Sequence, residues 1–202
     1  VLDALEERNL RENTYLVVAS DNGYMLGEKE TFTKFQLHEI SLRVPLFIAG
    51  PGIAPRLVRE PVSLIDLYPT LCGLAGLPIP PQCDGQDLSA TLFSGTAPSR
   101  ASALSYTGFL RKETGQLYLH STVRTPQWRL ISYTPIGWRS YAERFFDEVE
   151  LYDHDPASPG YDPNEWYNIA DKRPDVVKEL RAELPDPQTL MLTLSRRSDH
   201  ED

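Results

Sequence analysis

Residues 14–34 read TYLVVASDNGYMLGEKETFTK, and this stretch decides how the rest of the chain is interpreted. It begins with a run of β-branched and apolar residues, Tyr15 to Ala19, which predicts a buried β-strand. The strand is expected to end at the turn Ser20 to Gly23, which places a carboxylate and an amide at its C-terminal end. Ligands bind at that end of the strands in open α/β sheets, and Asp and Asn oxygens suit Ca²⁺ or Mg²⁺. Asp21 and Asn22 are therefore candidate metal ligands, while Asp-Asn-Gly is equally ordinary turn chemistry.

The flanking segments predict an α/β unit. Residues 1–12 have the apolar spacing of a short helix, and a helix that leads into a buried strand is half of an α/β repeat. We therefore expect a mostly parallel sheet, with a second buried strand over residues 44–49. A helix should begin at Ser63 as its N-cap and should kink at Pro69. Asp66 on this helix is expected to serve capping or a salt link rather than a metal.

A second unit is predicted after the loop-rich residues 76–100, where Pro, Gly, Ser and Ala are frequent. We divide the chain into a catalytic-core part, residues 1–98, and a small α+β subdomain, residues 99–202. The subdomain should contain an antiparallel sheet and a C-terminal helix over residues 174–184. Its predicted strands cover residues 103–106, 117–124, 129–133 and 148–152.

Composition limits the classes of function. The chain has 202 residues, of which 41% are hydrophobic, so it can form a real core. Its net charge of −9 argues against nucleic acid as the main partner. No apolar run reaches the length of a membrane span. The two cysteines, Cys72 and Cys83, have no metal-ligand spacing, and a disulfide between them is open but not required.

Several further motifs follow the turn in a fixed order. They are S-D-N-G at 20–23, L-G-E at 26–28, Lys34, E-x-x-x-R-V-P-L-F-I at 39–48, P-V-S-L-I-D-L-Y-P-T-L at 61–71, E-L-Y-D at 150–153 and W-Y-N-I-A at 166–170. Their order and spacing resemble the sulfatases of the alkaline-phosphatase-like superfamily. The resemblance implies the sandwich fold of that superfamily and covers nearly the whole chain.

The resemblance implies hydrolysis of sulfate esters. Asp21 and Asn22 would then bind a divalent cation, with Ca²⁺ as the first expectation, and Lys34 would be the catalytic residue that contacts the sulfate. An ammonium group is suited to neutralise a sulfate oxygen, whereas an isolated Lys is usually a solvated surface residue. Glu39 either supports the Lys34 loop or is a helix-face carboxylate. His38 is expected to be packed or hydrogen-bonded rather than a catalytic base.

The family nucleophile is a formylglycine made from the Cys or Ser of a C/S-x-P/A-x-R motif. Neither Cys72 nor Cys83 stands in such a motif. Thr96 has the x-P-S-R ending of a related nucleophile motif, but its Ser, Gly and Pro neighbours predict a loop. We therefore expect the nucleophile in an N-terminal half that precedes this segment, and negligible hydrolysis by the segment alone.

Two other functions stay open at this point. One is a phosphodiester or phosphonate hydrolase of the same superfamily, which uses the same metal chemistry. The other is a non-catalytic fragment or binding module that keeps the scaffold. The aromatic and basic loop with Trp138, Arg139 and Tyr141 is either a solvated face or a substrate-selecting loop.

Overall fold

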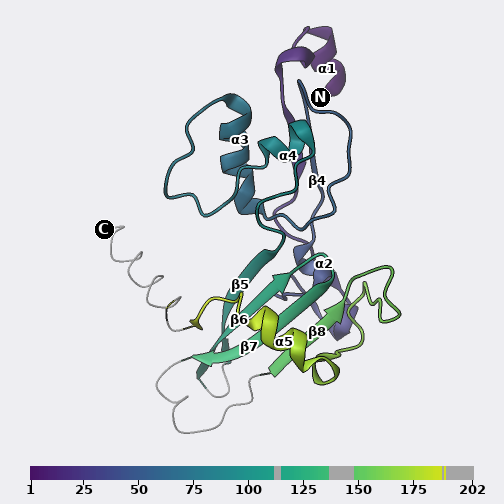
Figure 1. The fold of residues 1–202 in the computed structure, drawn as a ribbon, viewed down its shortest axis with the longest axis vertical. Helices are drawn as coiled ribbons and strands as arrows, with labels where there is room; N and C mark the ends of the chain where they lie inside the picture. The colour runs from purple at the N-terminus through teal and green to yellow at the C-terminus, as the bar shows by residue number, and fades with distance from the viewer. Residues whose placement is uncertain (112–114, 137–147, 188, 190–202) are drawn as a thin grey trace.

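The computed structural model describes residues 1–111, 115–136, 148–187 and 189 (Figure 1). The loop with Trp138, Arg139 and Tyr141 lies outside these residues. The N-terminal elements are α1 (Leu2–Glu7), η1 (Arg11–Asn13), β1 (Leu16–Ala19), β2 (Met25–Leu26), η2 (Glu28–Glu30), β3 (Phe32–Thr33), α2 (Glu39–Leu42) and β4 (Leu46–Ala49). Then come η3 (Leu64–Asp66), α3 (Leu67–Ala75), α4 (Ser89–Ser94), β5 (Ala103–Arg111), β6 (Gln116–Arg124), β7 (Trp128–Ile136), β8 (Glu148–Asp153), η5 (Ala170–Lys172) and α5 (Pro174–Arg181).

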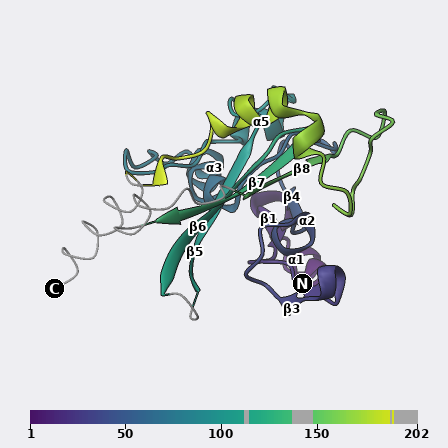
Figure 2. The same cartoon turned by 90° about the horizontal axis from the view of Figure 1, so that it is seen from below.

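The C-terminal half forms the predicted antiparallel sheet with its closing helix. The strand order is β5-β6-β7-β8, and every neighbouring pair is antiparallel. One face packs against α5, because Val123, Leu130 and Leu151 form a buried cluster with Val176 and Leu180. Figure 2 shows α5 lying along this face of the sheet. The sheet was predictable from the alternation of apolar and polar residues along its strands, and α5 was predictable from the Pro at its start.

The opposite face of the same sheet is covered by an N-terminal segment. Ile131 and Tyr152 alternate with the residues under α5, and they form a second buried cluster with Leu37. Figure 2 shows α2 and β3 on the side of the sheet opposite to α5. The segment from β2 to α2 therefore leaves the other N-terminal elements and packs on the C-terminal sheet (Figure 1).

The β1 and β4 strands pair with each other in the antiparallel direction, whereas the sequence predicted a mostly parallel sheet. Leu16 lies opposite Ala49, and Ala19 lies opposite Leu46. A parallel pair needs a crossover that returns the chain to the starting end of the first strand. Here the chain between β1 and β4 passes onto the C-terminal sheet and returns from the end where β1 stopped. Both strands are also less buried than predicted, since Val18 is 49% and Phe47 is 66% exposed.

The helix predicted from Ser63 begins as expected, but Pro69 lies near the start of α3 and not in its interior. Ser63 and Asp66 form a reciprocal capping box over η3, and α3 follows directly. Pro69 is only the third residue of α3, where a backbone N–H has no intrahelical acceptor to lose. The predicted capping role of Asp66 is confirmed. Cys72 and Cys83 are both free thiols. Among the described residues, every helix is too short or too polar to cross a membrane.

Candidate functional site

The Asp21–Asn22 turn follows β1 and leaves two oxygens available. Asp21 Oδ1 accepts a hydrogen bond from the backbone N–H of Asn22 at 2.9 Å. The Asn22 amide donates through Nδ2 to the backbone oxygen of Gly23 at 2.7 Å. Neither Asp21 Oδ2 nor Asn22 Oδ1 has a hydrogen-bond partner among the residues the structure describes. These oxygens fit a hard divalent cation, but Ca²⁺ takes about six to eight ligands, so the turn supplies only part of such a site.

The turn is held against α2 at very close range. The backbone N–H of Gly23 donates to the oxygen of Ser41 at 2.8 Å, and Ser41 is fully buried. A Cβ atom at position 23 would lie 2.0 Å from the backbone oxygen of Ile40. Only glycine allows this approach, so α2 sets the position of the candidate metal turn.

Lys34 lies in the loop between β3 and α2, and its side chain is exposed. It makes no hydrogen bond or ion pair with the part of the chain that is described, and none joins it to Asp21 or Asn22 there. Its ammonium group is therefore available to an anion. The turn and the lysine are related through α2, which follows the lysine loop and contacts the turn.

A buried group of charges lies where α2 meets the C-terminal sheet. We call it the Glu39 cluster, and its members are Glu39, Arg124, Arg129, His154 and Glu165. Glu39 Oε2 accepts from Arg124 Nε at 3.1 Å and from the Arg129 guanidinium. Glu165 Oε1 lies 2.8 Å from Arg129 Nε and 3.0 Å from His154 Nε2. Two carboxylates and two guanidiniums thus meet in a site where Arg129 and Glu165 are buried and Glu39 and Arg124 are partly buried.

The electrostatics of the cluster keep the Glu39 carboxylate ionised. Burial by itself would raise the pKa of Glu39, but the charges of Arg129 and Arg124 outweigh it and lower the pKa to about 2. Burial lowers the pKa of the Arg124 guanidinium, and the attraction of Glu39 opposes this. Removing one member would leave an uncompensated buried charge, which is far more costly than losing a surface pair.

Glu39, His154 and Glu165 bring three potential metal-ligand atoms within 4.8 Å of one another. The hydrogen bonds argue against a cation there. Glu165 Oε2 accepts from the backbone N–H of Glu39 at 2.8 Å, and its Oε1 faces Arg129 and His154. A cation would have to displace two guanidiniums that already balance the negative charge. The cluster is therefore an ion-pair network rather than a metal centre.

A second hydrogen-bonded chain runs beside the cluster. His38 is buried, and its Nε2 lies 2.9 Å from Glu150 Oε2. The Tyr152 hydroxyl donates to Glu150 Oε2 at 2.7 Å and accepts from Lys29 Nζ at 3.1 Å. Burial would raise the pKa of Glu150, but the hydrogen bonds from His38 and Tyr152 lower it. His38 is thus the packed, hydrogen-bonded histidine that the sequence predicted.

Most of these residues could not be assigned from the sequence. Glu39 had two open interpretations, support of the Lys34 loop or a helix-face carboxylate, and Lys29 and His154 had no predicted role. Arg129 and Glu165 were not singled out because long-range ion pairs leave no periodic pattern in the sequence. Two motifs contained other residues of the site, since E-x-x-x-R-V-P-L-F-I begins at Glu39 and E-L-Y-D contains Glu150 and Tyr152. Thr96 lies in an exposed loop and hydrogen-bonds Ser94, as its loop interpretation predicted.

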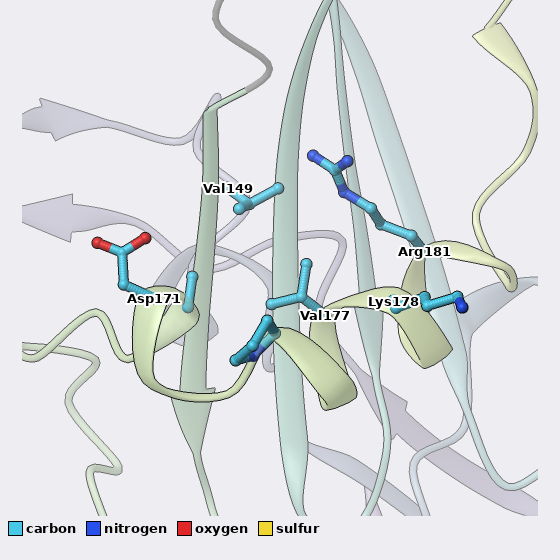
Figure 3. Close-up of a pocket in the computed structure, with 7 residues that line it drawn as sticks. Val149, Asp171, Val177, Lys178 and Arg181 are labelled. Atoms are coloured by element: carbon cyan, nitrogen blue, oxygen red, sulfur yellow. The ribbon is translucent and has the colours of Figure 1, made fainter.

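A separate open hollow lies between α5 and the end of the sheet, and Figure 3 shows its lining. It is lined by Val149, Ala170, Asp171, Pro174, Val177, Lys178 and Arg181. None of the residues proposed for metal or sulfate contact lines it. The hollow therefore adds nothing to the site around α2.

The fold resembles that of the alkaline-phosphatase-like hydrolases. Residues 1–77 match the family model described as Sulfatase. Arylsulfatase K of Mus musculus is 30% identical over 188 residues, and a sulfatase of Formosa agariphila is 32% identical over 192 residues. Choline-sulfatase of Rhizobium meliloti is 43% identical over 91 residues, 44% of this chain and 18% of that protein. These matches identify the chain as a relative of the sulfatases that resembles their C-terminal portion.

Solved structures agree with this assignment. A 2-O GAG sulfatase superimposes with a TM-score of 0.70 at 26% identity, and the match covers 99% of this chain and 40% of that one. A protein solved with its substrate D-glucosamine-2-N,6-O-disulfate superimposes with a TM-score of 0.65 at 27% identity, covering 99% and 38%. The arylsulfatase K and Formosa agariphila matches show a similar proportion, since they cover 91% and 92% of this chain but 32% of each relative. The chain thus spans about a third of the length of the curated relatives it matches.

Proposed function

We propose that this chain forms the C-terminal part of an enzyme that hydrolyses sulfate esters. Asp21 and Asn22 supply part of a divalent-cation site, and Lys34 contacts the sulfate group of the substrate. One observation carries the proposal: the same short helix, α2, contacts the Asp21–Asn22 turn and directly follows the Lys34 loop. The position of α2 therefore fixes the candidate cation ligands and the lysine relative to each other.

Each residue has a distinct task in this proposal. Asp21 and Asn22 would hold a divalent cation, which would polarise sulfate oxygens and favour attack at sulfur. Asp21 and Asn22 offer it a carboxylate oxygen and an amide oxygen. The Lys34 ammonium, which is exposed and unpaired within the described residues, neutralises charge on a sulfate oxygen as the ester bond breaks. The nucleophile is assigned to an N-terminal portion, because neither cysteine of this chain stands in the required motif.

Apolar side chains exposed on β1, β4 and α3 favour the presence of an N-terminal portion that packs against them. Val18 and Phe47 are exposed on the two strands of the β1–β4 sheet, and Tyr68 and Leu71 are exposed on α3. Large apolar faces of this kind mark a surface that another part of a protein covers. Relatives about three times as long as the matched segment have room for such a portion. We therefore expect the N-terminal portion to pack on β1, β4 and α3.

The test is hydrolysis by the polypeptide with its upstream coding sequence included. Release of nitrophenol from nitrophenyl sulfate should exceed release from bis(nitrophenyl) phosphate, since a phosphodiesterase would show the reverse preference. Lys34→Ala should lower kcat/KM by about 100-fold or more, the scale of losing a preorganised electrostatic contact. The 202-residue chain alone should show no turnover above background.

The matched control is Lys172→Ala, which removes an exposed lysine from η5. It should leave kcat/KM unchanged. Equal effects of the two lysine variants would refute the role of Lys34. Substantial turnover by the 202-residue chain, lost in Lys34→Ala, would instead refute the assignment of the nucleophile to another portion.

A further inference from the structure

The loop that carries Lys34 is anchored to the C-terminal sheet at both of its ends. The first anchor is Lys29, five positions before it in η2. Lys29 Nζ donates to the Tyr152 hydroxyl at 3.1 Å and to the backbone oxygen of Glu165. The same ammonium lies 4.9 Å above the centre of the Tyr152 ring. One side chain therefore reaches over the edge of β8 and fixes the start of the loop.

The second anchor is Glu39, five positions after Lys34. Its backbone N–H donates to Glu165 Oε2 at 2.8 Å, and its carboxylate binds Arg124 and Arg129. Both anchors thus meet at Glu165, which accepts from Lys29 through its backbone and from Glu39 through its side chain. Glu165 is itself 1% exposed. A single buried residue sets the distance between the two ends of the loop.

Backbone strain is concentrated at the same place. Four non-glycine residues in the described ranges have positive φ, and three of them are Lys29, Glu30 and Glu165, at 50°, 56° and 59°. Such conformations cost about 1–3 kcal/mol each and persist where surrounding contacts hold them. The hydrogen bonds of Lys29 and Glu165 supply those contacts. Strained residues of this kind cluster at sites where geometry matters for function.

We propose that Lys29 and Glu165 are positioning residues that act through Lys34. They fix the ends of the loop of residues 30–37 on the C-terminal sheet and so hold the Lys34 ammonium at the sulfate position. The proposal rests on the proposed function of Lys34. It assigns to the C-terminal sheet a part in placing a substrate-contacting group, although the strands of this sheet lie far from Lys34 in the sequence.

A double-mutant cycle tests whether the two residues act through Lys34. Lys29→Met keeps the apolar stem but removes the donor, and it should lower kcat/KM about tenfold or more, since small misplacements of a reacting group are costly. In a Lys34→Ala background the same change should alter kcat/KM by less than about twofold. A residue with only a structural role would lower activity by the same factor in both backgrounds, and that result overturns the proposal.

Two further variants separate position from folding. Lys29→Arg can still donate to Tyr152 and to the Glu165 backbone, so it should restore most of the activity. Lys172→Met makes the same chemical change at an exposed lysine and should have no effect. Failure of the arginine variant to recover activity above Lys29→Met would contradict the anchor at position 29.

Hydrogen exchange on the 202-residue chain gives a readout that does not depend on activity. Glu165→Gln and Lys29→Met should raise the exchange of a peptide covering residues 27–42 by about tenfold, while residues 174–181 stay protected. Glu179→Gln on the exposed side of α5 is the matched control. Unchanged exchange at 27–42 refutes the anchoring. Raised exchange together with a harmless Lys34→Ala would refute the proposed function of Lys34 and, with it, the catalytic role of both anchors.

Discussion

Arg100 joins the loop before the C-terminal sheet to the start of α3 by donating from Nη2 to both carboxylate oxygens of Asp66, at 2.8 Å and 3.0 Å. Asp66 is fully buried and also accepts from the backbone N–H groups of Ser63 and Gln86. One carboxylate therefore connects three separate segments of the chain. Such a group is expected to stabilise the fold rather than to take part in the reaction.

Asp66→Ala should destabilise the protein strongly. It removes the acceptor of two backbone N–H groups and leaves the Arg100 guanidinium without its partner. Loss of one member of a buried ion pair costs about 3–5 kcal/mol. Urea unfolding followed by circular dichroism measures the change in the free energy of unfolding. Asp175→Asn, in the exposed Arg173–Asp175 pair, should leave the midpoint where it is, and a similar shift in both variants would contradict the buried role of Asp66.

The parts of the fold with strong local patterns were predictable from sequence. The strands that became β6, β7 and β8 alternate apolar and polar residues, and α5 begins at Pro174 with its apolar residues on one face. The role of Asp66 was also predictable, because a capping residue acts on its own helix. These features depend on neighbours within a few residues, which is the range over which a sequence pattern carries information.

Features that depend on distant partners were not predictable in the same way. The direction of β4 relative to β1 depends on the path of the intervening chain, which no local pattern records. Glu39 and Glu165 are 126 positions apart. Each is a charged residue of a type that is usually exposed, so nothing in the sequence marked either as buried. The assignments of Asp21, Asn22 and Lys34 depended on motif resemblance and remain predictions.

The Glu39 cluster should make stability depend on acid pH. The pKa of Glu39 is lowered from 4.5 to about 2 in the folded protein. The unfolded state therefore binds more protons than the folded state between these values, and stability falls as pH decreases through that window. The loss from this group is on the order of 3 kcal/mol between about pH 5 and pH 2 and is absent above pH 6.

Urea unfolding at a series of pH values checks this dependence. The free energy of unfolding of Glu39→Gln should be lower than that of the unaltered protein at neutral pH and should change less as the pH falls from 5 to 3. Glu179→Gln, an exposed change of the same type, should keep the original slope. Parallel curves for Glu39→Gln and the unaltered protein would show that the Glu39 carboxylate is not held by Arg124 and Arg129.

Removal of divalent cations should inactivate the polypeptide that includes its upstream sequence. In the proposed function Asp21 and Asn22 supply two of the roughly six to eight ligands that Ca²⁺ takes. A chelator should therefore abolish hydrolysis, and added Ca²⁺ should restore it. Bound cation should also raise the melting temperature, because a ligand that binds the folded state stabilises it. Asp21→Ala should remove both effects. Asp171→Ala, at an exposed position of η5, is the control, and full activity in the presence of chelator would exclude a cation from the reaction.

The close approach of Gly23 to α2 gives a prediction that does not depend on catalysis. Gly23→Ala would place a Cβ 2.0 Å from the backbone oxygen of Ile40, and backbone atoms cannot give way as a flexible side chain can. The turn must then move away from α2 and lose the bond from residue 23 to Ser41. Overpacking of this kind costs about 1–3 kcal/mol.

Gly108→Ala provides the matched comparison for this change, because a Cβ at position 108 would meet no atom within 4 Å. Its urea midpoint should stay close to that of the unaltered protein, whereas the midpoint of Gly23→Ala should fall. In the polypeptide with its upstream sequence, Gly23→Ala should also weaken Ca²⁺ binding, since it displaces Asp21 and Asn22 together. Equal midpoints for the two alanine variants would show that α2 does not hold the turn. The proposal that α2 positions both the cation ligands and Lys34 would then be wrong.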